Sequence, residues 1–399
     1  MKLREPQEAV DALVERLSPV ATERVELGRA VGRVLAEAVK ADRDSPPRDV
    51  SSMDGYAVRL EDARQPRLPL AGEIPIGTAP PAMIRGHAWR VVTGACVPPE
   101  AEAVVRREDT EESDDSIRLT IDPGQIPTGQ YIRRQGENVR AGTELIASGT
   151  PINPGVIAAL ASFGCTNPLV HRRVNVGLLT TGDELVPPSE EPPPWKIRDA
   201  NGPVLRSLLG PAEWLELVPA NNARDSLEAL EATLTMLLGS CDVVIATGGV
   251  SMGNRDFVPA AVERVGGQTV FHKLRQKPGK PMLGAVGPAG QAVLGLPGNP
   301  VSVMVTARRF AYAILRRLGG FSAAVPPTTL VTLRDPDDER LDLWWHRPVK
   351  LCSDGEAELL SSRGSGDIAA SARSDGFVCF PPGHAGRGPW PYWSWRLPE

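Results

Sequence analysis

Two adjacent glycines, a serine and a carboxylate follow a strand-like run in the middle of this chain. Residues 243–246 are apolar and mostly β-branched, and they lead into Thr247-Gly248-Gly249. A run without polar alternation is typical of an inner parallel strand covered on both faces. Glycines carry no Cβ, so backbone N–H groups can converge there on an anion, with Ser251 adding a hydroxyl and Asp256 a carboxylate. A tight turn without a ligand explains the same residues equally well.

Further loops of this character follow other strand-like runs. Gly182-Asp183-Glu184 comes after one, Lys277-Pro278-Gly279-Lys280 forms a second loop, and Pro297-Gly298 follows another run. The carboxyl ends of parallel strands meet at one edge of a doubly wound sheet, which predicts that these loops lie together. Carboxylates bind Mg²⁺ and lysines neutralise phosphate oxygens, so the pattern indicates a phosphate held together with Mg²⁺. Taken singly, each charged residue is more simply solvated surface.

Length and composition limit the classes of protein. A chain of 399 residues predicts roughly two to four domains. The net charge of −5 provides no basic surface for nucleic acid. Five cysteines without a Cys-x-x-Cys pair favour reduced thiols over disulfides or a zinc site. No run approaches the length of about 20 apolar residues that spans a membrane, so we expect a soluble, cytoplasmic protein.

Hydrophobic periodicity predicts several domains. Residues 5–17 and 28–41 carry apolar faces at helical spacing, whereas 67–145 contain short strands separated by Gly and Pro. A small-residue helix at 156–163 would pack back on the first helix, which makes the N-terminal domain discontinuous.

Helices alternate with strands from about residue 174 to 320, which is typical of a layered α/β domain. Strands are expected at 174–179, 215–218, 243–247 and 293–296. Asp225 with Glu228 three residues later predicts a capping box, and Asn299-Pro300 predicts a second helix start. Short strands resume beyond residue 326, and the aromatic tail at 390–395 predicts a packed terminal strand, with an interface as the alternative.

A series of motifs resembles the molybdopterin molybdenumtransferase family, which includes the MoeA proteins and the E domain of gephyrin. In chain order the motifs are Gly-Arg-Val-Leu-Ala-Glu at 32–37, Ser-Met-Asp-Gly-Tyr-Ala at 52–57, Arg-Val-Val-Thr-Gly-Ala at 90–95, Thr-Gly-Asp-Glu-Leu at 181–185, Ile-Arg-Asp-Ala-Asn at 197–201, Gly-Gly-Val-Ser-Met-Gly at 248–253, Lys-Pro-Gly-Lys-Pro at 277–281 and Leu-Pro-Gly-Asn-Pro-Val-Ser at 296–302. Their order and spacing extend over nearly the whole chain.

The resemblance implies an α/β and β multidomain fold. A central MogA-like α/β domain is accompanied by discontinuous N-terminal α and β domains and a C-terminal β domain. The expected boundaries are 1–26 with 42–50 and 139–170 for the helical and linker domain, 27–41 with 51–138 for the mostly β domain, 171–322 for the α/β molybdopterin-binding domain, and 323–399 for the C-terminal domain. A homodimer is also implied, with each active cleft shared between the subunits.

The implied activity is that of a transferase in molybdenum cofactor biosynthesis. Members of the family insert molybdate into adenylylated molybdopterin, release AMP and use Mg²⁺. The expected protein partners are molybdopterin adenylyltransferase and apo-molybdoenzymes, with no nucleic acid and no membrane.

The resemblance also assigns roles to residues of this chain. The expected catalytic residues are Asp54, Thr93, Asp183, Glu184, Asp256, Lys277 and Lys280, of which Glu184 and Asp256 would hold the metal. The expected substrate contacts are Gly182, Asn201, Gly248, Gly249, Ser251, Pro297, Gly298, Arg347 and Ser365. Without the resemblance, Asp54-Gly55 is more simply a turn. Arg340 is a weaker alternative to Arg347.

Two departures leave other functions open. Asn138 stands where the family usually has an acid, although Glu137 is adjacent, and Asp225-Ser226 replaces a usual pair of aspartates. The alternatives are a catalytically weak pterin-binding or scaffold paralogue and a molybdopterin adenylyltransferase. The N-terminal pattern around Asp54 and Thr93 argues against the adenylyltransferase.

Overall fold

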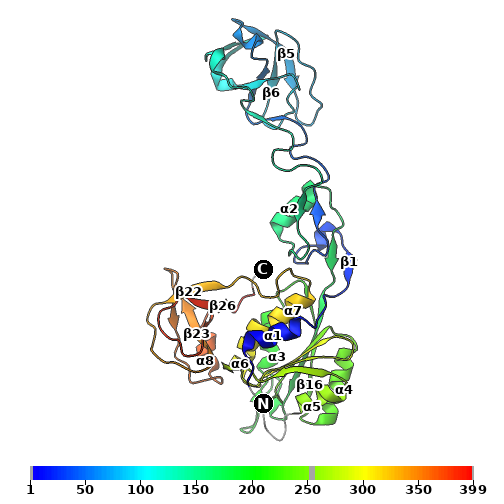
Figure 1. The fold of residues 1–399 in the computed structure, drawn as a ribbon, viewed down its shortest axis with the longest axis vertical. Helices are drawn as coiled ribbons and strands as arrows, with labels where there is room; N and C mark the ends of the chain where they lie inside the picture. The colour runs from blue at the N-terminus through cyan, green and yellow to red at the C-terminus, as the bar shows by residue number, and fades with distance from the viewer. Residues whose placement is uncertain (1–2, 251–256, 398–399) are drawn as a thin grey trace. The chain divides into compact units, whose positions relative to one another are not determined.

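The computed structural model describes residues 3–250 and 257–397, apart from the side chains at 219–221, and it divides into two compact units. Unit 1 comprises Met1–Glu37, Ala147–Ala158 and Thr166–Glu399, and unit 2 comprises Ala38–Ile146 and Ala159–Cys165 (Figure 1). The finer division into four domains stays a prediction.

A six-stranded α/β sheet forms the centre of unit 1. Its strand order is β16-β13-β17-β21-β20-β18, with the first four strands parallel and the last two antiparallel to their neighbours. The strands are β13 (Val174–Thr181), β16 (Leu215–Ala223), β17 (Val243–Thr247), β18 (Gln268–His272), β20 (Leu283–Val286) and β21 (Ala292–Leu296). The strands expected in this region are confirmed. The apolar run at β17 is buried throughout, as an inner parallel strand requires.

Both faces of this sheet are covered by helices (Figure 1). Val243 and Ile245 pack with one layer, whereas Val244 and Ala246 pack with the other, because successive strand residues point to opposite faces. The first layer contains α1 (Pro6–Val14), α3 (Asn201–Leu209), α6 (Pro300–Thr306) and α7 (Tyr312–Leu318), and the second contains α4 (Leu227–Leu238) and α5 (Val258–Arg264). A π-helical turn, Ala307–Ala311, joins α6 to α7.

The C-terminal part of unit 1 is a second six-stranded sheet of order β19-β23-β24-β22-β26-β25, closed by a further pairing of β23 with β25. It contains β19 (Gln276–Lys277), β22 (Thr329–Leu333), β23 (Trp344–Leu351), β24 (Glu356–Leu359), β25 (Gly376–Phe380) and β26 (Trp390–Ser394), with α8 (Ile368–Ala372) before β25. The predicted packed aromatic strand is β26, whose Trp393 ring stacks 5.6 Å from that of Phe377. Lys277 in β19 pairs with Trp345 in β23. Because β19 lies between β18 and β20 in the sequence, the segment that connects two strands of the α/β sheet also forms a strand of the C-terminal sheet.

Arg309 provides a second link between the helical layer and the C-terminal sheet. Its Nη1 lies 3.0 Å from Cys379 Sγ and 3.1 Å from His346 Nε2. Its guanidinium carbon also lies 5.4 Å from the ring centre of Trp344 and 5.1 Å from that of Trp393. A desolvated cation beside aromatic rings gains cation–π attraction, which fixes the position of the π-helical turn against the sheet.

The helix expected at residues 28–41 is not formed, and that prediction was wrong. Leu27–Arg29 forms a 3-10 turn, and the chain reaches β2 (Val39–Lys40) without an α-helix. Gly32 has φ +73°, a left-handed conformation that interrupts a right-handed helix. Val34 and Leu35 are buried instead through bridges to distant strand-like segments.

Short two-stranded pairs accompany the larger sheets in both units. They are β1 (Thr22–Arg24) with β12 (Leu169–His171), β2 with β11 (Glu144–Ile146), and β14 (Leu185–Val186) with β15 (Ile197–Arg198). The predicted small-residue helix is α2 (Pro154–Ser162).

Unit 2 is built on a third six-stranded sheet of order β7-β4-β6-β5-β9-β8. Its strands are β4 (Gly55–Val58), β5 (Leu68–Ile74), β6 (Ala88–Val91), β7 (Ala103–Arg106), β8 (Thr110–Ser113) and β9 (Ser116–Leu119), with the short pair β3 (Val50–Ser51) and β10 (Ile132–Arg133) beside them. Tyr56 and Ala57 in β4 belong to two different apolar clusters, one on each face of the sheet.

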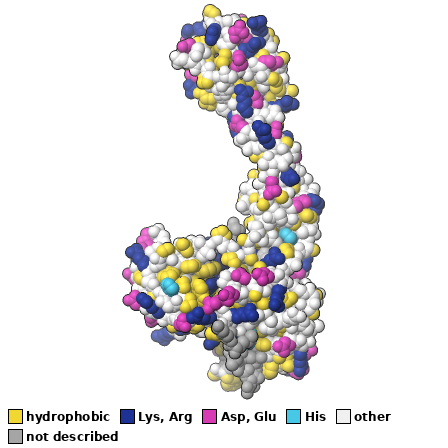
Figure 2. Space-filling view, in the orientation of Figure 1, with side chains coloured by type: hydrophobic (Ala, Val, Ile, Leu, Met, Phe, Trp, Pro, Cys, Tyr) yellow, Lys and Arg dark blue, Asp and Glu magenta, His cyan; other side chains and the backbone are white. Residues whose placement is uncertain are grey.

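Acidic and basic side chains are mixed over the face shown in Figure 2, which agrees with the small net charge. Among the helices of the described residues, none has the length and apolar character that crossing a membrane requires.

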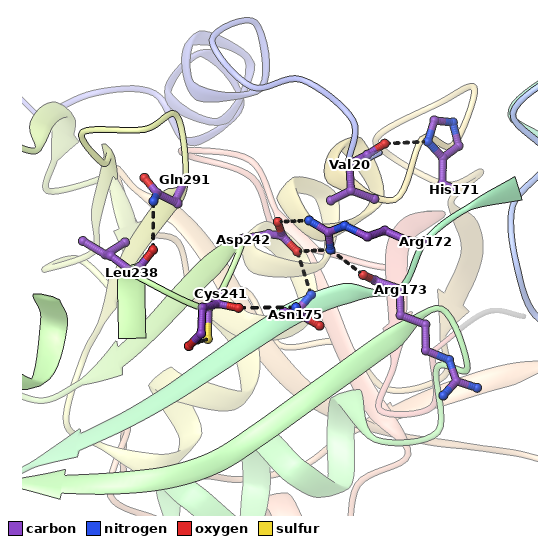
Figure 3. A network of polar contacts seen from close by, with 10 residues as sticks. Val20, His171, Arg172, Arg173, Asn175, Leu238, Cys241, Asp242 and Gln291 are labelled. Carbon is purple, nitrogen blue, oxygen red and sulfur yellow. Dashed lines mark hydrogen bonds and ion pairs between the residues drawn. The ribbon is translucent and has the colours of Figure 1, made fainter. Parts of the chain in front are cut away.

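A polar network holds the amino ends of β13 and β17 together (Figure 3). Asp242 accepts hydrogen bonds from Arg172 Nη2 at 2.6 Å and Nη1 at 2.7 Å, and from the Asn175 N–H at 2.8 Å. The Asp242 N–H in turn donates to the Asn175 carbonyl at 2.9 Å. The hydrogen bond to Asp242 raises the pKa of the Arg172 guanidinium. These bonds set the register of the two strands that lead to the opposite edge of the sheet.

We expect Asp242→Ala to lower the free energy of unfolding of unit 1 by about 2–3 kcal/mol, because a paired guanidinium and a backbone N–H both lose their acceptor. The measurement is urea denaturation followed by tryptophan fluorescence, which reports mainly on unit 1 because Trp89 is the only tryptophan of unit 2. Glu216→Ala is the control, since it removes only an exposed partner of Arg173 and should cost less than about 1 kcal/mol. Equal losses in the two variants would contradict the stated role of Asp242.

Candidate functional site

A cavity of about 1200 Å³ opens at the carboxyl edge of the parallel strands in unit 1. The loops after β13, β17 and β21 all reach it, contributing Gly182, Gly248, Gly249, Pro297 and Gly298 to its lining. The structure therefore brings together the three glycine loops that the sequence predicted would converge.

The backbone at the end of β13 and the backbone of the loop after β17 are in close contact. Gly248 has φ +91°, and a Cβ on it would lie 2.6 Å from the Thr181 carbonyl oxygen. Gly249 follows with φ +60°. The Gly248 N–H donates to the Leu296 carbonyl at 3.2 Å, so it joins strands rather than facing a ligand. Gly248 is therefore required for the close approach of two strand ends.

Two exposed lysines supply positive charge at the cavity. Lys277 and Lys280 lie at the two ends of one lining loop, whose shape is held by Gln276 Nε2 donating to the Gly279 carbonyl at 2.9 Å. Gln276 Oε1 lies 3.4 Å from His346 Nε2. Burial, with Arg309 nearby, holds the pKa of His346 well below its usual value. The histidine is therefore neutral and adds no charge to this wall.

The C-terminal sheet, which includes Lys277 in β19, contributes further residues to the lining. Trp345, Arg347 and Ser365 line the cavity there, as the resemblance implied for Arg347 and Ser365. Ser365 Oγ accepts a hydrogen bond from Asn299 Nδ2 at 2.8 Å, which joins the two walls. The Lys277 Nζ lies 5.7 Å from the ring centre of Trp345. Arg340 is not among the described residues that line the cavity.

Asn201 presents an unpaired acceptor at the cavity. Its Nδ2 donates to the Gly298 carbonyl at 2.8 Å, and the residue is only 6% exposed. Its Oδ1 is buried without a partner in the described chain. A buried polar atom without a partner costs free energy, so an N–H or O–H group of a ligand would be stabilised there.

Glu184 and Asp225 bring carboxylates to the cavity. Asp225 Oδ1 accepts from Thr181 Oγ1 at 2.5 Å, and Asp225 Oδ2 accepts from the Asp183 N–H at 3.3 Å. Asp183 Oδ1 accepts from the Asp225 N–H at 3.3 Å, so Asp183 fixes the loop and is not itself part of the lining.

The predicted capping box at Asp225 was wrong by one residue. The residue that caps α4 is Ser226, whose Oγ accepts from the Ala229 N–H at 3.2 Å. Serine and aspartate are nearly equivalent caps, so the sequence could not decide between adjacent positions. Because Ser226 caps α4, the Asp225 carboxylate is available to the cavity, a position that the sequence did not predict.

Part of the predicted metal site lies outside the residues that the structure describes. Asp256 and Ser251 lie outside the described residues. In the described ranges 3–250 and 257–397, no group of three or more His, Cys, Asp or Glu side chains is gathered as a metal centre. Mg²⁺ commonly binds through one or two carboxylates together with substrate phosphates, and the oxygen donors Glu184 and Asp225 fit that pattern.

Asp54 and Thr93 belong to unit 2, where they contact each other. Asp54 Oδ1 accepts from the Thr93 N–H at 2.7 Å and from Thr93 Oγ1 at 2.9 Å. The backbone hydrogen bond, followed by the hydroxyl bond, lowers the pKa of Asp54. The structure thus joins a carboxylate and a hydroxyl at an exposed turn.

The neutral residue at position 138 is held by a neighbouring cation. Asn138 Oδ1 accepts from Arg133 Nη2 at 2.7 Å. Glu137 Oε1 accepts from Arg133 Nε at 2.5 Å, and Glu137 Oε2 accepts from the Arg134 N–H at 2.8 Å. Glu137 is therefore engaged within its own turn.

Substitution at two adjacent positions separates the helix cap from the cavity carboxylate. Ser226→Ala should cost about 1 kcal/mol of unfolding free energy and leave ligand binding unchanged. Asp225→Asn keeps an oxygen that can accept from Thr181, so it should cost less, yet it should weaken Mg²⁺ binding in the presence of pyrophosphate by about tenfold. Urea denaturation and calorimetric titration test both statements. The assignment fails if Asp225→Asn costs the stability and Ser226→Ala loses the metal.

Two family models match the chain. One, described as MoeA N-terminal region (domain I and II), matches residues 4–164, and the other, described as probable molybdopterin binding domain, matches residues 177–317. The second range contains most of the cavity residues contributed by the α/β domain.

Relatives named molybdopterin molybdenumtransferase are similar over most of the chain. The one from Nostoc sp. is 36% identical over 330 residues, covering 80% of this chain and 74% of its own. The one from Haemophilus influenzae is 35% identical over 318 residues, covering 78% and 77%. A crystal structure of the molybdopterin biosynthesis MoeA protein from Pyrococcus horikoshii matches with a TM-score of 0.81 at 27% identity, over 98% of this chain and 100% of that one. The chain therefore belongs to the molybdopterin molybdenumtransferase family.

Proposed function

We propose that the cavity of unit 1 binds adenylylated molybdopterin and molybdate, and that the chain releases AMP as molybdenum is inserted. As a member of its family, the chain is a transferase of molybdenum cofactor biosynthesis. The observation that supports the finer proposal is the meeting of Lys277, Lys280 and two carboxylates in one cavity. Cleavage at a phosphate needs charge neutralisation and positioning more than it needs a covalent nucleophile.

Each wall of the cavity supplies a different part of the proposed chemistry. Lys277 and Lys280 neutralise phosphate oxygens, and Asn201 Oδ1 accepts from an N–H or O–H group of the substrate. Arg347 and Ser365 bind molybdate. Glu184 and Asp225, with Asp256, would hold Mg²⁺, which when bound supplies further charge neutralisation at the phosphates. No thiol of the chain is required, because the substrate carries the sulfur atoms.

Release of AMP from adenylylated molybdopterin tests this proposal. Lys277→Ala and Lys280→Ala should each lower kcat/KM by at least about 100-fold, because a charge that stabilises the phosphate in the transition state is lost. Lys273→Ala, a lysine outside the cavity lining, is the control and should retain activity within about threefold of the wild type. Tight pterin binding without AMP release in the wild type would favour the weak or scaffold paralogue, for which neutral Asn138 is the supporting observation.

We also propose a cytoplasmic homodimer in which Asp54 and Thr93 of one subunit complete the cavity of the other. The resemblance supports the shared cleft, and the exposed Asp54–Thr93 turn leaves both side chains accessible. The free cysteines among the described residues agree with a reducing compartment.

Mixing two inactive variants tests the shared cleft. Asp54→Ala and Lys277→Ala homodimers should each be inactive, whereas co-refolded or subunit-exchanged mixtures should recover about a quarter of the wild-type activity. Half of the dimers in the mixture are then mixed, and each mixed dimer carries one intact cleft of two. A mixture as inactive as its components would place Asp54 and Lys277 in the same subunit's cleft, whereas an active Asp54→Ala homodimer would remove Asp54 from the site.

A further inference from the structure

Arg347 is already bound to a carboxylate of its own chain. Its Nη1 donates to Asp337 Oδ1 and its Nη2 donates to Asp337 Oδ2, both at 2.6 Å. Arg347 and Asp337 both line the cavity. A pair of parallel hydrogen bonds of this kind uses the guanidinium edge that would otherwise receive two oxygens of an anion.

The guanidinium is fixed, whereas the carboxylate comes from a more exposed segment. The Arg347 side chain is 12% exposed and lies over the Trp345 ring, with its central carbon 4.3 Å from the ring centre. The Asp337 side chain is 42% exposed and belongs to the irregular segment 334–343 between β22 and β23. Arg347 is thus a preset donor, and Asp337 is the partner that can leave.

The segment is unusually acidic for the wall of an anion site. It reads Arg-Asp-Pro-Asp-Asp-Glu-Arg-Leu-Asp-Leu, and Asp335 and Glu339 also line the cavity. The hydrogen bond from Arg347 lowers the pKa of Asp337, so the carboxylate stays ionised at neutral pH. Lys277 and Lys280 also line the cavity, so an incoming anion can bind to other cations before it displaces Asp337.

We infer that Asp337 is a built-in competitor for the oxyanion site: its carboxylate occupies the two Arg347 donors that an oxyanion takes, and the oxyanion binds by displacing it. This inference rests on the proposed function, in which Arg347 meets molybdate. A tetrahedral oxyanion presents two oxygens to a guanidinium as a carboxylate does, so the exchange needs no movement of Arg347. The apparent affinity is reduced by the fraction of Arg347 that is free, and Asp337 is therefore a residue that sets affinity without contacting the oxyanion.

The direction of the effect distinguishes this role from a structural one. A pair that merely held Arg347 in place would weaken oxyanion binding when broken. Competition predicts the opposite, because replacing the carboxylate by a neutral amide removes the charge and one of the two acceptors that occupy Arg347, while Trp345 still holds the guanidinium.

The experiment measures molybdate binding to the full chain by isothermal titration calorimetry. Asp337→Asn should bind molybdate about tenfold more tightly than the wild type, and Asp337→Glu should return the affinity toward the wild type. Glu339→Gln is the matched control, since it removes one negative charge from the same wall without breaking the Arg347 pair. Its gain should stay below about threefold, because exposed charges are screened by salt.

Three results would overturn the inference. Weaker or unchanged binding in Asp337→Asn would make the pair structural, and equal gains in Asp337→Asn and Glu339→Gln would reduce the effect to general charge. Binding that Arg347→Ala leaves intact would place the oxyanion elsewhere. In the first two results a loss of binding in Arg347→Ala, together with AMP release by the wild type, would still support the proposed function, so the two failures are distinguishable.

Discussion

The cavity depends on a backbone approach that only glycine permits. At the carboxyl edge of the central sheet, the loop after β17 turns back through Gly248 so closely that a Cβ there would lie 2.6 Å from the Thr181 carbonyl oxygen. Both residues line the cavity, and Thr181 also donates to Asp225. One steric constraint therefore sets the distance between two strand ends and the position of a carboxylate. The amino ends of the same strands are fixed by Asp242, so the sheet is held in register at both edges.

The second wall is positioned by interactions of a different kind. β19 carries Lys277 into a parallel pairing with β23, which places the lysine opposite Trp345. Arg309, among aromatic rings and beside His346, holds the helical layer against the same sheet. Trp345 on β23 thus lies near two cations of the cavity, Lys277 and Arg347. The cavity is a product of two sheets in one unit, and neither sheet forms it alone.

The cavity carries both cationic and anionic side chains. The lysines and Arg347 attract phosphate and oxyanion groups, whereas Glu184 and Asp225 can bind a cation. The acidic segment 334–343 repels additional anions. Neutral His346 keeps one more positive charge out of the wall at neutral pH. Such a balance favours ligands that bring their charges to particular positions over anions in general.

The sequence by itself determined the fold class, the parallel strands and the convergence of the glycine loops, because β-branched runs and glycine turns are local signals with a topological consequence. It failed where local signals were ambiguous. The apolar spacing at 28–41 is also that of a helix, which Gly32 interrupts, and the spacing of Asp225 and Glu228 predicts a cap that Ser226 provides instead. Only the tertiary structure decided that Asp225 faces the cavity, that Trp345 holds Arg347, and that Asp337 pairs with it. These contacts join residues from separate segments, and sequence spacing carries no information on which side chains of distant segments meet.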